Sequence, residues 1–558
     1  MAEPEAVGVI LSGASTESAD CQLYDYAERG KIREGMFLLI PRDEGRGILV
    51  RVAKMIPSNE YYTKGDAWSE ARRRRLPIPD QIARQYEVCE LEILGEVPKL
   101  HSLSVPPYAG EQVVKIDVSQ NPERIFGVKK QEPGVIWYGS LVGYEKSPIP
   151  LTIEGIPMHL AVFGTTGSGK SYGVGAFIEQ LVNIYDTDSS ILSLPMLIVD
   201  ANADYIDYAE YFKKKESFGA ASDIVRYVFP NSREARIRKP HTRQLAINLN
   251  FLGRRDLAEI IVSYYHGGSR EELQVSAIES LIGRLEDQGL IARPQNNEAD
   301  YQRIFTSEEM FERVLDELDQ MQRDGLHPAT KRAVETAMHK FHDIDSLEYR
   351  LFSTQPQFGF GSVDQLTQNR EIAIIDFSAD GAPGVSLALK QLIMSYLAAV
   401  LYSRFTQYKI QGEERYLLFI IEEAQNYVPN LSEYDVGYSL AKEKLAIIAT
   451  QGRKFGLGLC LVSQRPSFVD PVVLSMCNSF FIHRVSPQDV SFVEKVTGGL
   501  PASLSRRLTR LEQGELIVHG QMNKVPIPFL IKGPSRQPDI GHSYGTTKVL
   551  EGLRRLKR

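Results

Sequence analysis

The spacing of hydrophobic residues follows three patterns along this chain, and each pattern predicts a different kind of structure. In the N-terminal part, short β-rich runs alternate with turn residues, and no long helical pattern separates them. Several short strands at close spacing predict a small β-barrel or a sandwich. These runs occupy residues 7–11, 36–40, 47–52 and 86–94.

A second pattern, with apolar residues at helical spacing, fills residues 254–351. Because strand-like runs stand on both sides of this block, we interpret it as a helical insertion between strands of one α/β sheet. It contains no motif with a recognisable chemistry. The periodicity predicts helices at residues 256–262, 271–288, 307–323 and 328–341.

The third pattern, short buried strands that alternate with helices, surrounds this block and is typical of an α/β core. We expect its strands at residues 160–163, 196–200, 372–376, 416–421 and 459–463. The predicted organisation has five segments. They are a β-barrel and linker at 1–145, an α/β core at 146–253 and 352–533, the helical insertion at 254–351, and a polar tail at 534–558.

Composition narrows the class of protein without naming a partner. The 558 residues are 43% hydrophobic and 24% charged, which allows about two to four globular domains. A net charge of −7 is small for this length, so contact with nucleic acid would need local basic patches. We expect a soluble cytoplasmic protein, because we find neither a signal peptide nor an apolar run of about 20 residues. The cysteines lack metal or disulfide spacing and are predicted core residues: Cys21, Cys89, Cys460 and Cys477.

A glycine-rich segment between an apolar strand and a helix carries the clearest chemical signal. Residues 164–171 match the phosphate-binding pattern G-x-x-x-x-G-K-[ST] at every fixed position. Its glycines let backbone N–H groups face phosphate oxygens, and the helix N-terminus favours the anion. We expect Lys170 to reach the β- and γ-phosphates and Ser171 to ligate Mg²⁺. The predicted nucleotide-binding residues are Gly164, Thr165, Thr166, Gly167, Ser168, Gly169, Lys170, Ser171 and Tyr172.

Two acids end another hydrophobic strand, as in a Walker B element. Glu422, which stands where aspartate is usual, is expected to hold Mg²⁺ together with Ser171. Glu423 is the predicted catalytic base that polarises the attacking water. Asp200 ends a further buried strand and either belongs to the surroundings of the metal or caps the next turn.

Two later phrases contain candidates for the remaining catalytic groups. Gln464 ends a strand that we expect between the P-loop and Walker B strands, where it would contact the γ-phosphate. Arg453 or Arg465 could supply the positive charge that stabilises the transition state, from the same or a neighbouring copy of the chain. Either arginine could instead form a structural ion pair.

Basic residues gather in three places that could contact DNA phosphates. They are the four arginines at 72–75, the lysines at 213–215 and the interval 231–243. A solvated surface explains each of them as well, since charge alone does not distinguish the two interpretations.

Taken in order, these phrases resemble the HerA family of hexameric DNA-translocating ATPases, within the HerA/FtsK group of RecA-like motors. The resemblance covers nearly the whole chain. It rests on residues 164–171, 200–205, 420–425, 452–456 and 463–466. It implies a RecA-like P-loop ATPase core of α/β class with an N-terminal β-barrel and an inserted helical bundle.

The same resemblance implies cofactors and partners. A homohexameric ring would bind ATP and Mg²⁺ between subunits and thread double-stranded DNA through its centre. It would work with a NurA-like nuclease in DNA repair, or with a nuclease or sirtuin-like NADase in antiviral defence. Upstream of the P-loop, where we look for an arginine that acts on a neighbouring subunit, this chain has His159.

Two other functions are open at this point. The ring could be a nucleotide-gated scaffold that activates a partner effector in defence without sustained translocation. A metabolic P-loop kinase is disfavoured, because no acceptor-substrate domain or lid is recognisable in the sequence.

Overall fold

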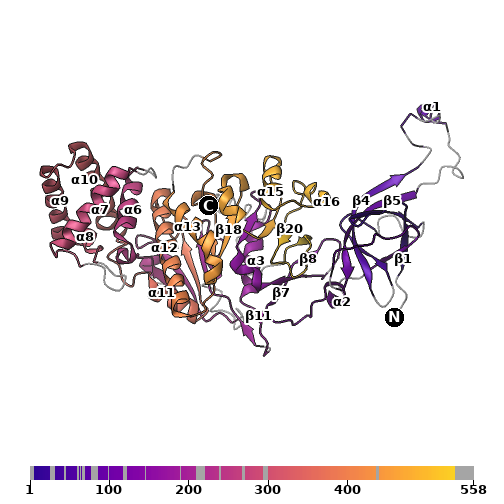
Figure 1. Ribbon diagram of the computed structural model, residues 1–558, viewed down its shortest axis with the longest axis horizontal. Coiled ribbons are helices and arrows are strands. Elements are labelled where there is room, and N and C mark those ends of the chain that lie inside the picture. The colour runs from indigo at the N-terminus through magenta and orange to yellow at the C-terminus, as the bar shows by residue number, and fades with distance from the viewer. Residues whose placement is uncertain are drawn as a thin grey trace, which may run out of the picture.

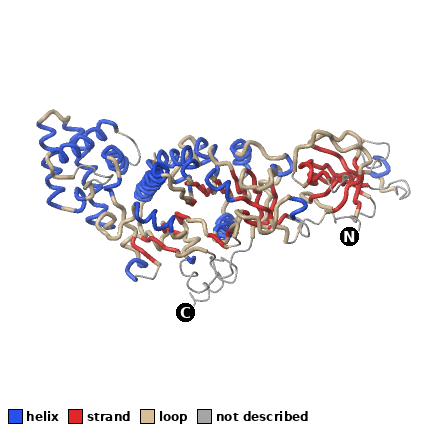
Figure 2. Tube along the Cα trace, turned by 60° about the horizontal axis from the view of Figure 1, so that its bottom comes forward, coloured by secondary structure: helices blue, strands red, loops and turns tan. Residues whose placement is uncertain are grey.

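Three regions follow one another along the long axis of the molecule. In the computed structural model, a β-barrel lies at one end, a large sheet in the middle and a group of helices at the other end (Figure 1). Figure 2 shows the same division from another side, with strands gathered in the barrel and in the centre. The structure describes residues 5–24, 32–42, 46–59, 62, 64–65, 69–76, 86–98, 100–116, 122–144, 146–188, 190–208, 220–237, 241–266, 271–292, 300–434 and 439–534.

The N-terminal strands close into a barrel, as predicted, and the sandwich alternative is wrong. Their order around the barrel is β1-β2-β5-β4-β3-β6. Inward-facing side chains such as Leu38, Val50 and Leu91 fill its core. The strands are β1 (Ala6–Ile10), β2 (Ser18–Leu23), β3 (Phe37–Pro41), β4 (Gly47–Ser58), β5 (Tyr86–Val97) and β6 (Gln112–Lys115).

The central sheet has 11 strands in the order β15-β14-β16-β13-β17-β18-β10-β19-β20-β21-β8. The strands from β15 to β19 in this order are parallel, and the last three are antiparallel. Its parallel strands are β10 (Leu160–Phe163), β13 (Met196–Asp200), β14 (Ile224–Val228), β15 (Thr242–Gln244), β16 (Ile372–Asp376), β17 (Leu417–Ile421), β18 (Leu457–Ser463) and β19 (Ser479–Ile482). The others are β8 (Ser140–Leu141), β20 (Glu515–Gly520) and β21 (Phe529–Lys532).

Both faces of this sheet are buried, which explains why its central strands β10 and β17 are apolar at every position. Along β10, Leu160 and Val162 enter one core, and Ala161 and Phe163 enter the other. Helix α3 (Lys170–Leu181) packs into the first core, and helices α12 (Leu387–Gln411) and α13 (Leu440–Gln451) pack into the second. Parallel strands covered on both faces read as continuous hydrophobic runs, so the predicted α/β core is confirmed.

Between β15 and β16 the chain forms helices whose side chains extend the second core. Leu257, Leu281 and Phe341 belong to the same buried cluster as Phe163 of the sheet. Each of the four helices predicted from periodicity is present, with bounds that differ by a few residues. The helices are α6 (Arg254–His266), α7 (Glu272–Asp287), α8 (Arg303–Thr306), α9 (Glu308–Arg323), α10 (Pro328–Asp343) and, after the π-helix Ile344–Tyr349, α11 (Phe360–Gln368).

A buried arginine joins the barrel to the central region. The Arg51 guanidinium, 1% exposed, pairs with Glu92 of the neighbouring barrel strand β5 and donates to the Pro528 carbonyl at 2.8 Å. Ser503 donates to the same Glu92 carboxylate at 2.9 Å. A charge removed from water costs little only when its hydrogen bonds are complete, so these contacts fix the barrel against the core.

Several predictions can be compared with the described residues. The four cysteines are free and buried, as expected for core residues. In the described ranges, no helix is long and apolar enough to cross a membrane. In the arginine run, Arg73 and Arg74 bond Glu70 on the surface beside helix α1 (Ser69–Arg73). Lysines 213–215, residues 238–240 and tail residues 535–558 lie outside the described residues.

Candidate active site

The predicted functional segments lie side by side at one edge of the sheet, because neighbouring parallel strands carry them. Strand β18 pairs with β10 on one side and with β17 on the other. The P-loop, Glu422 and Gln464 follow the carboxyl ends of these three strands. Gln464 therefore stands between the P-loop and the Walker B acids, as the sequence predicted. Ligands of open parallel sheets bind at this carboxyl edge.

The P-loop has the backbone that a phosphate cradle needs. Gly167 and Gly169 have φ angles of 75° and 97°, which residues with a Cβ atom rarely adopt. At Gly164 a Cβ atom would lie 2.6 Å from Ser168 Oγ and 2.7 Å from His483 Cβ. Helix α3 starts at Lys170, so its free N–H groups and positive dipole end face the loop.

The side chains of the P-loop differ in exposure in a way that fits their predicted roles. Lys170 is buried, whereas Tyr172, two residues later in the same turn, is 46% exposed. Ser171 is partly buried. Thr165 donates to the Arg484 carbonyl at 3.1 Å, which ties the loop to the chain after β19.

A hydrogen-bonded relay connects the P-loop to the predicted base. The Thr166 hydroxyl donates to Gln464 Oε1 at 2.6 Å. The amide of the same glutamine donates to Glu423 Oε1 at 2.5 Å. Gln464 is thus in contact with both the loop that would hold the γ-phosphate and the carboxylate that would activate water.

Gln425 is a residue of this site whose role the sequence analysis missed. Its amide nitrogen donates to Glu423 Oε2, and its Oε1 accepts from Ser463 Oγ at 2.8 Å. Both oxygens of Glu423 therefore accept an amide hydrogen. Gln425 was visible in the sequence as the residue two positions after the acid pair, but its contact with β18 depends on the order of the strands.

The backbone at Glu423 is strained. Its φ angle is 50°, in the left-handed region. A residue with a side chain persists there only when its surroundings hold it, and such positions cluster at active sites. Here the two glutamine amides hold the side chain.

Glu422 is more deeply buried than Glu423. It is 1% exposed, and Tyr205 donates its hydroxyl to Glu422 Oε1 at 2.6 Å. Burial, and then the neighbouring Asp200, raise the pKa of Glu422 to about 8, although Lys170 opposes this shift. Glu422 Oε2 has no hydrogen-bond partner among the described residues.

Asp200 organises the loop that follows β13, which favours the capping role that the sequence left open. Its carboxylate accepts backbone N–H groups of Asn202 at 3.2 Å, Asp204 at 3.0 Å and Tyr205 at 2.8 Å. Burial nevertheless raises the pKa of Asp200 to about 7. Backbone donors oppose that shift because they stabilise the ionised form.

The residues at this edge fit a divalent cation. Carboxylate oxygens of Asp200, Asp204 and Glu422 lie within 4.8 Å of one another. Hard oxygen ligands are those that Mg²⁺ prefers. The buried and unpartnered Glu422 Oε2 is the atom for which a cation would supply the missing interaction. The predicted hydroxyl ligand, Ser171, is the second residue of helix α3.

The two candidate arginines lie in different surroundings. Arg465 Nε bonds Asp489 at 3.0 Å, and its guanidinium stacks on Phe468 at 4.5 Å, so it forms a structural ion pair. Arg453 is exposed and follows α13 in the 3₁₀-helix Gly452–Phe455, which immediately precedes β18. It therefore lies at the amino edge of the sheet, away from the P-loop of its own chain.

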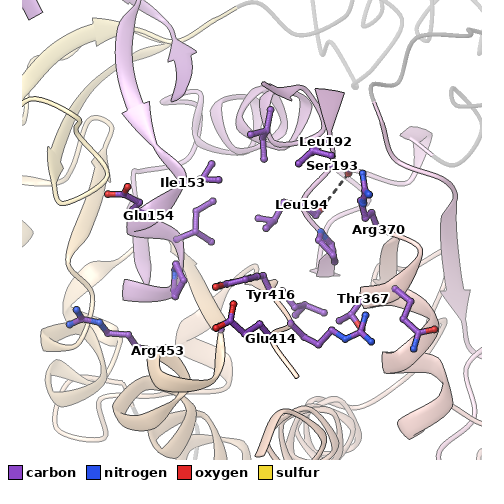
Figure 3. A pocket seen from close by; sticks show the side chains of 18 of the residues that line it. Ile153, Glu154, Leu192, Ser193, Leu194, Thr367, Arg370, Glu414, Tyr416 and Arg453 are labelled. Atoms are coloured by element: carbon purple, nitrogen blue, oxygen red, sulfur yellow. Dashed lines mark hydrogen bonds between the residues drawn. The ribbon is translucent and has the colours of Figure 1, made fainter. Parts of the chain in front are cut away.

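A cavity of about 720 Å³ opens at that amino edge, and Arg453 is on its rim (Figure 3). The figure shows Glu154, Glu414 and Tyr416 around the same opening. These residues precede β10 and β17, just as Arg453 precedes β18. The structure therefore does not bring Arg453 together with the other predicted catalytic residues of the same chain.

His159 is a structural clamp at the amino edge. Its Nδ1 accepts the Leu459 N–H at 3.0 Å, which leaves Nε2 to donate to the Ala449 carbonyl at 2.9 Å. Burial lowers the pKa of His159 to about 4. The imidazole is thus neutral and fully bonded, and it does not take the place of a catalytic arginine.

Comparison with known proteins finds a matching family model, similar helicases and solved structures that partly resemble the chain. Residues 136–402 match the family model described as helicase HerA, central domain. The DNA double-strand break repair helicase HerA of Sulfolobus acidocaldarius is 25% identical over 539 residues, 94% of this chain and 92% of that protein. The protein of the same description from Sulfurisphaera tokodaii is 21% identical over 537 residues, 94% of this chain and 92% of that protein. Among solved structures, VirB4 of Thermoanaerobacter pseudethanolicus covers 72% of this chain and 97% of its own, with a TM-score of 0.48 and 10% identity.

The family match includes both the P-loop and the Asp200–Tyr205 segment. The two archaeal helicases align along nearly the full length of this chain. The ordered motifs and these matches agree. Along nearly its full length the chain is similar to HerA helicases, and it is an ATP-hydrolysing P-loop enzyme.

Proposed function

We propose that this ATPase is a double-stranded DNA translocase or helicase of the HerA type. It acts as a homohexameric ring that hydrolyses ATP at its subunit boundaries. The segments proposed from the sequence, including the helices of 254–351 as an inserted bundle, would be the parts of each subunit. A partner nuclease of NurA type, or a nuclease or NADase of antiviral defence, would use the ring.

The observation that carries the proposal is the relay Thr166–Gln464–Glu423 at the carboxyl edge. A protein that only binds nucleotide needs a phosphate cradle and a cation site. It has no need of a strained acid, of two amides that donate to that acid, or of a link from the acid through Gln464 to the P-loop. This combination supports hydrolysis that is coupled to the state of the γ-phosphate.

The residues would divide the chemistry among themselves as follows. Lys170 and the P-loop N–H groups would bind the β- and γ-phosphates, and Glu423 would accept a proton from the attacking water. Both oxygens of Glu423 are bonded to amides, so one amide must release its oxygen first. Gln464 is the amide that also contacts the P-loop, and a γ-phosphate oxygen would compete for it.

Ser171 and Glu422 would hold Mg²⁺, which neutralises phosphate charge when it is bound. Glu422 must be ionised for this role. Lys170 already favours the ionised form, against the burial that raises the pKa of Glu422.

The test is ATP turnover by the purified chain with and without duplex DNA. We expect duplex DNA to stimulate turnover several-fold. The variant Glu423→Gln keeps the size and hydrogen-bonding ability of the side chain, and should bind ATP while turnover falls roughly 10³-fold, as for loss of a general base.

Glu433→Gln is the matched control, since Glu433 is an exposed acid in the loop after the Walker B strand. It should behave as wild type. Intact basal hydrolysis that no DNA stimulates would contradict the translocase and favour the nucleotide-gated scaffold. Particle mass with and without nucleotide tests the ring.

A further inference from the structure

Tyr205, in the loop after β13, contacts Glu422 through its hydroxyl. The oxygen–oxygen distance is 2.6 Å, and both side chains are essentially inaccessible to solvent. The two residues are 217 positions apart in the sequence. A buried phenol that donates to a buried carboxylate forms a short, charge-assisted hydrogen bond when the carboxylate is ionised.

Contacts of its backbone and of its ring hold Tyr205 in place. Its N–H donates to Asp200 Oδ2 at 2.8 Å, and Asp200 also holds two other N–H groups of the same loop. Its ring stacks on Tyr208, with centroids 6.2 Å apart. Neither the ring nor the hydroxyl can move far without breaking this buried loop.

The hydroxyl occupies one of the two oxygens of Glu422. Oε1 accepts from Tyr205, and Oε2 has no partner in the described part of the chain. The bond therefore sets the rotation of the carboxylate and decides which oxygen is free.

We propose that Tyr205 is a positioning residue that orients Glu422 Oε2 toward the Mg²⁺ of the bound nucleotide. The inference rests on the proposed metal role of Glu422 and gives a role to Tyr205, which lies in the 200–205 motif but had no role assigned to it. Hydrogen-bond partners of metal-binding carboxylates fix their orientation, and their removal weakens metal affinity. Asp200 acts one step further out, because it holds the loop that carries Tyr205.

Tyr208 provides a matched control in the same loop. It is equally buried, and its hydroxyl donates to the Gly175 carbonyl at 2.7 Å and to Glu179 at 3.1 Å. These partners belong to helix α3 rather than to the Walker B acids. Tyr208→Phe thus removes a buried hydroxyl from the same stacked pair without touching Glu422.

The experiment measures the affinity of ADP for the full chain in Mg²⁺ and in EDTA, by titration calorimetry, for wild type, Tyr205→Phe and Tyr208→Phe. The quantity of interest is the ratio of the two affinities, because it isolates the contribution of the metal. Tyr205→Phe should reduce this ratio about 10-fold, as for the loss of an outer hydrogen-bond partner of a metal ligand. Its affinity in EDTA and the ratio of Tyr208→Phe should equal those of wild type.

A second measurement covers the case in which Tyr205→Phe folds less well. In the background of Glu422→Gln, the tyrosine substitution should produce no further change in the ratio, because the group that it orients has gone. Melting temperatures show how far each variant is destabilised. The ratio itself compares two titrations of one preparation, so an inactive fraction does not alter it.

The outcomes separate this inference from the proposed function. An unchanged ratio for Tyr205→Phe, in a chain whose wild-type ratio is large, would overturn the positioning role alone. An equal fall for Tyr205→Phe and Tyr208→Phe would also overturn it, since packing would then be the cause. A wild-type chain that binds ADP equally well with and without Mg²⁺ would overturn both the metal role of Glu422 and this inference.

Discussion

The two edges of the central sheet are made by the same strands but have opposite chemical character. At the carboxyl edge, Asp200, Glu422 and Glu423 meet the P-loop, and their oxygens accept hydrogen bonds from tyrosine, glutamine and backbone groups. At the amino edge, a largely apolar cavity has Arg453 on its rim, and His159 is buried and neutral.

The difference follows from the direction of the strands. Helices that follow parallel strands begin at the carboxyl edge, so free N–H groups and positive dipole ends collect there and favour anions. The amino edge has no such field. A cation that is exposed at the amino edge can act on a phosphate only if another molecule brings that phosphate to it. The first edge is thus equipped to bind an anion. In the proposed ring, an exposed cation at the second edge would act on the phosphate of a neighbour.

The largest effect that would test this comparison concerns Arg453. We expect Arg453→Ala to lower the kcat for ATP roughly 10³-fold, the lower end of what an arginine finger contributes. Its own P-loop should still bind nucleotide, because Arg453 lies at the opposite edge of the sheet. The adjacent exposed residue Lys454 provides the control variant Lys454→Ala, which should keep nearly full activity.

Mixing of variants shows whether the arginine acts between subunits. A Lys170→Ala chain has no working phosphate site of its own but keeps Arg453. When it is mixed with Arg453→Ala, some subunit boundaries contain one intact site and one intact arginine, and ATPase activity should return. Mixtures that remain as inactive as the separate variants would contradict action in trans.

A smaller effect is expected at Gln425, on the other edge. Gln425→Ala removes one of the two amides on Glu423 and breaks the link to Ser463. We expect kcat to fall about 10-fold with little change in KM, since an interaction with the base is lost and none with the substrate. Steady-state kinetics measures both constants.

Gln451→Ala is the amino-edge counterpart for this experiment. Gln451 is exposed, and its side-chain oxygen accepts the Tyr402 hydroxyl at 2.7 Å. It should leave kcat unchanged. A rise in KM without loss of kcat in Gln425→Ala would mean that Gln425 contributes to binding, and would contradict its place beside the base.

The sequence predicted the parts of this enzyme whose chemistry is continuous in the chain. The P-loop needs glycines, Lys170 and Ser171 in one short segment, and the Walker B acids end a strand that is apolar throughout. Helices α7 and α9 were predicted to within a residue because their periodicity is strong and Ser307 caps the second of them.

Features that depend on the pairing of distant strands could not be predicted. The contact of Tyr205 with Glu422 spans 217 residues, and that of Gln425 with Ser463 requires that β17 and β18 be neighbours. Barrel strand β2 was missed because its sequence, Ser-Ala-Asp-Cys-Gln-Leu, contains no β-branched or aromatic residue. It forms a strand because it pairs with β1 on one side and with β5 on the other, so tertiary context outweighs its weak strand propensity.

The smallest effect on activity is expected for a substitution of His159, whose role at the amino edge is structural. The pH dependence of stability tests that role. Burial lowers the pKa of His159 from about 6.5 to about 4, so between these values the unfolded chain binds a proton that the folded chain does not. Stability therefore rises with pH across this window, by about 3 kcal/mol for this group at about 1.4 kcal/mol per pH unit.

His159→Gln removes that dependence along with the bonds to Leu459 and Ala449. At pH 7 the variant should melt several degrees below wild type, and the gap should narrow as the pH falls toward 4.5, because only wild type then carries the growing penalty of a buried imidazole. ATPase activity at pH 7.5, per folded molecule, should be close to that of wild type. A difference in melting temperature that stays constant from pH 7 to pH 4.5 would show that His159 is not held neutral. A collapse of ATPase activity in a well-folded variant would show that the amino edge, which we regard as structural, also takes part in the chemistry.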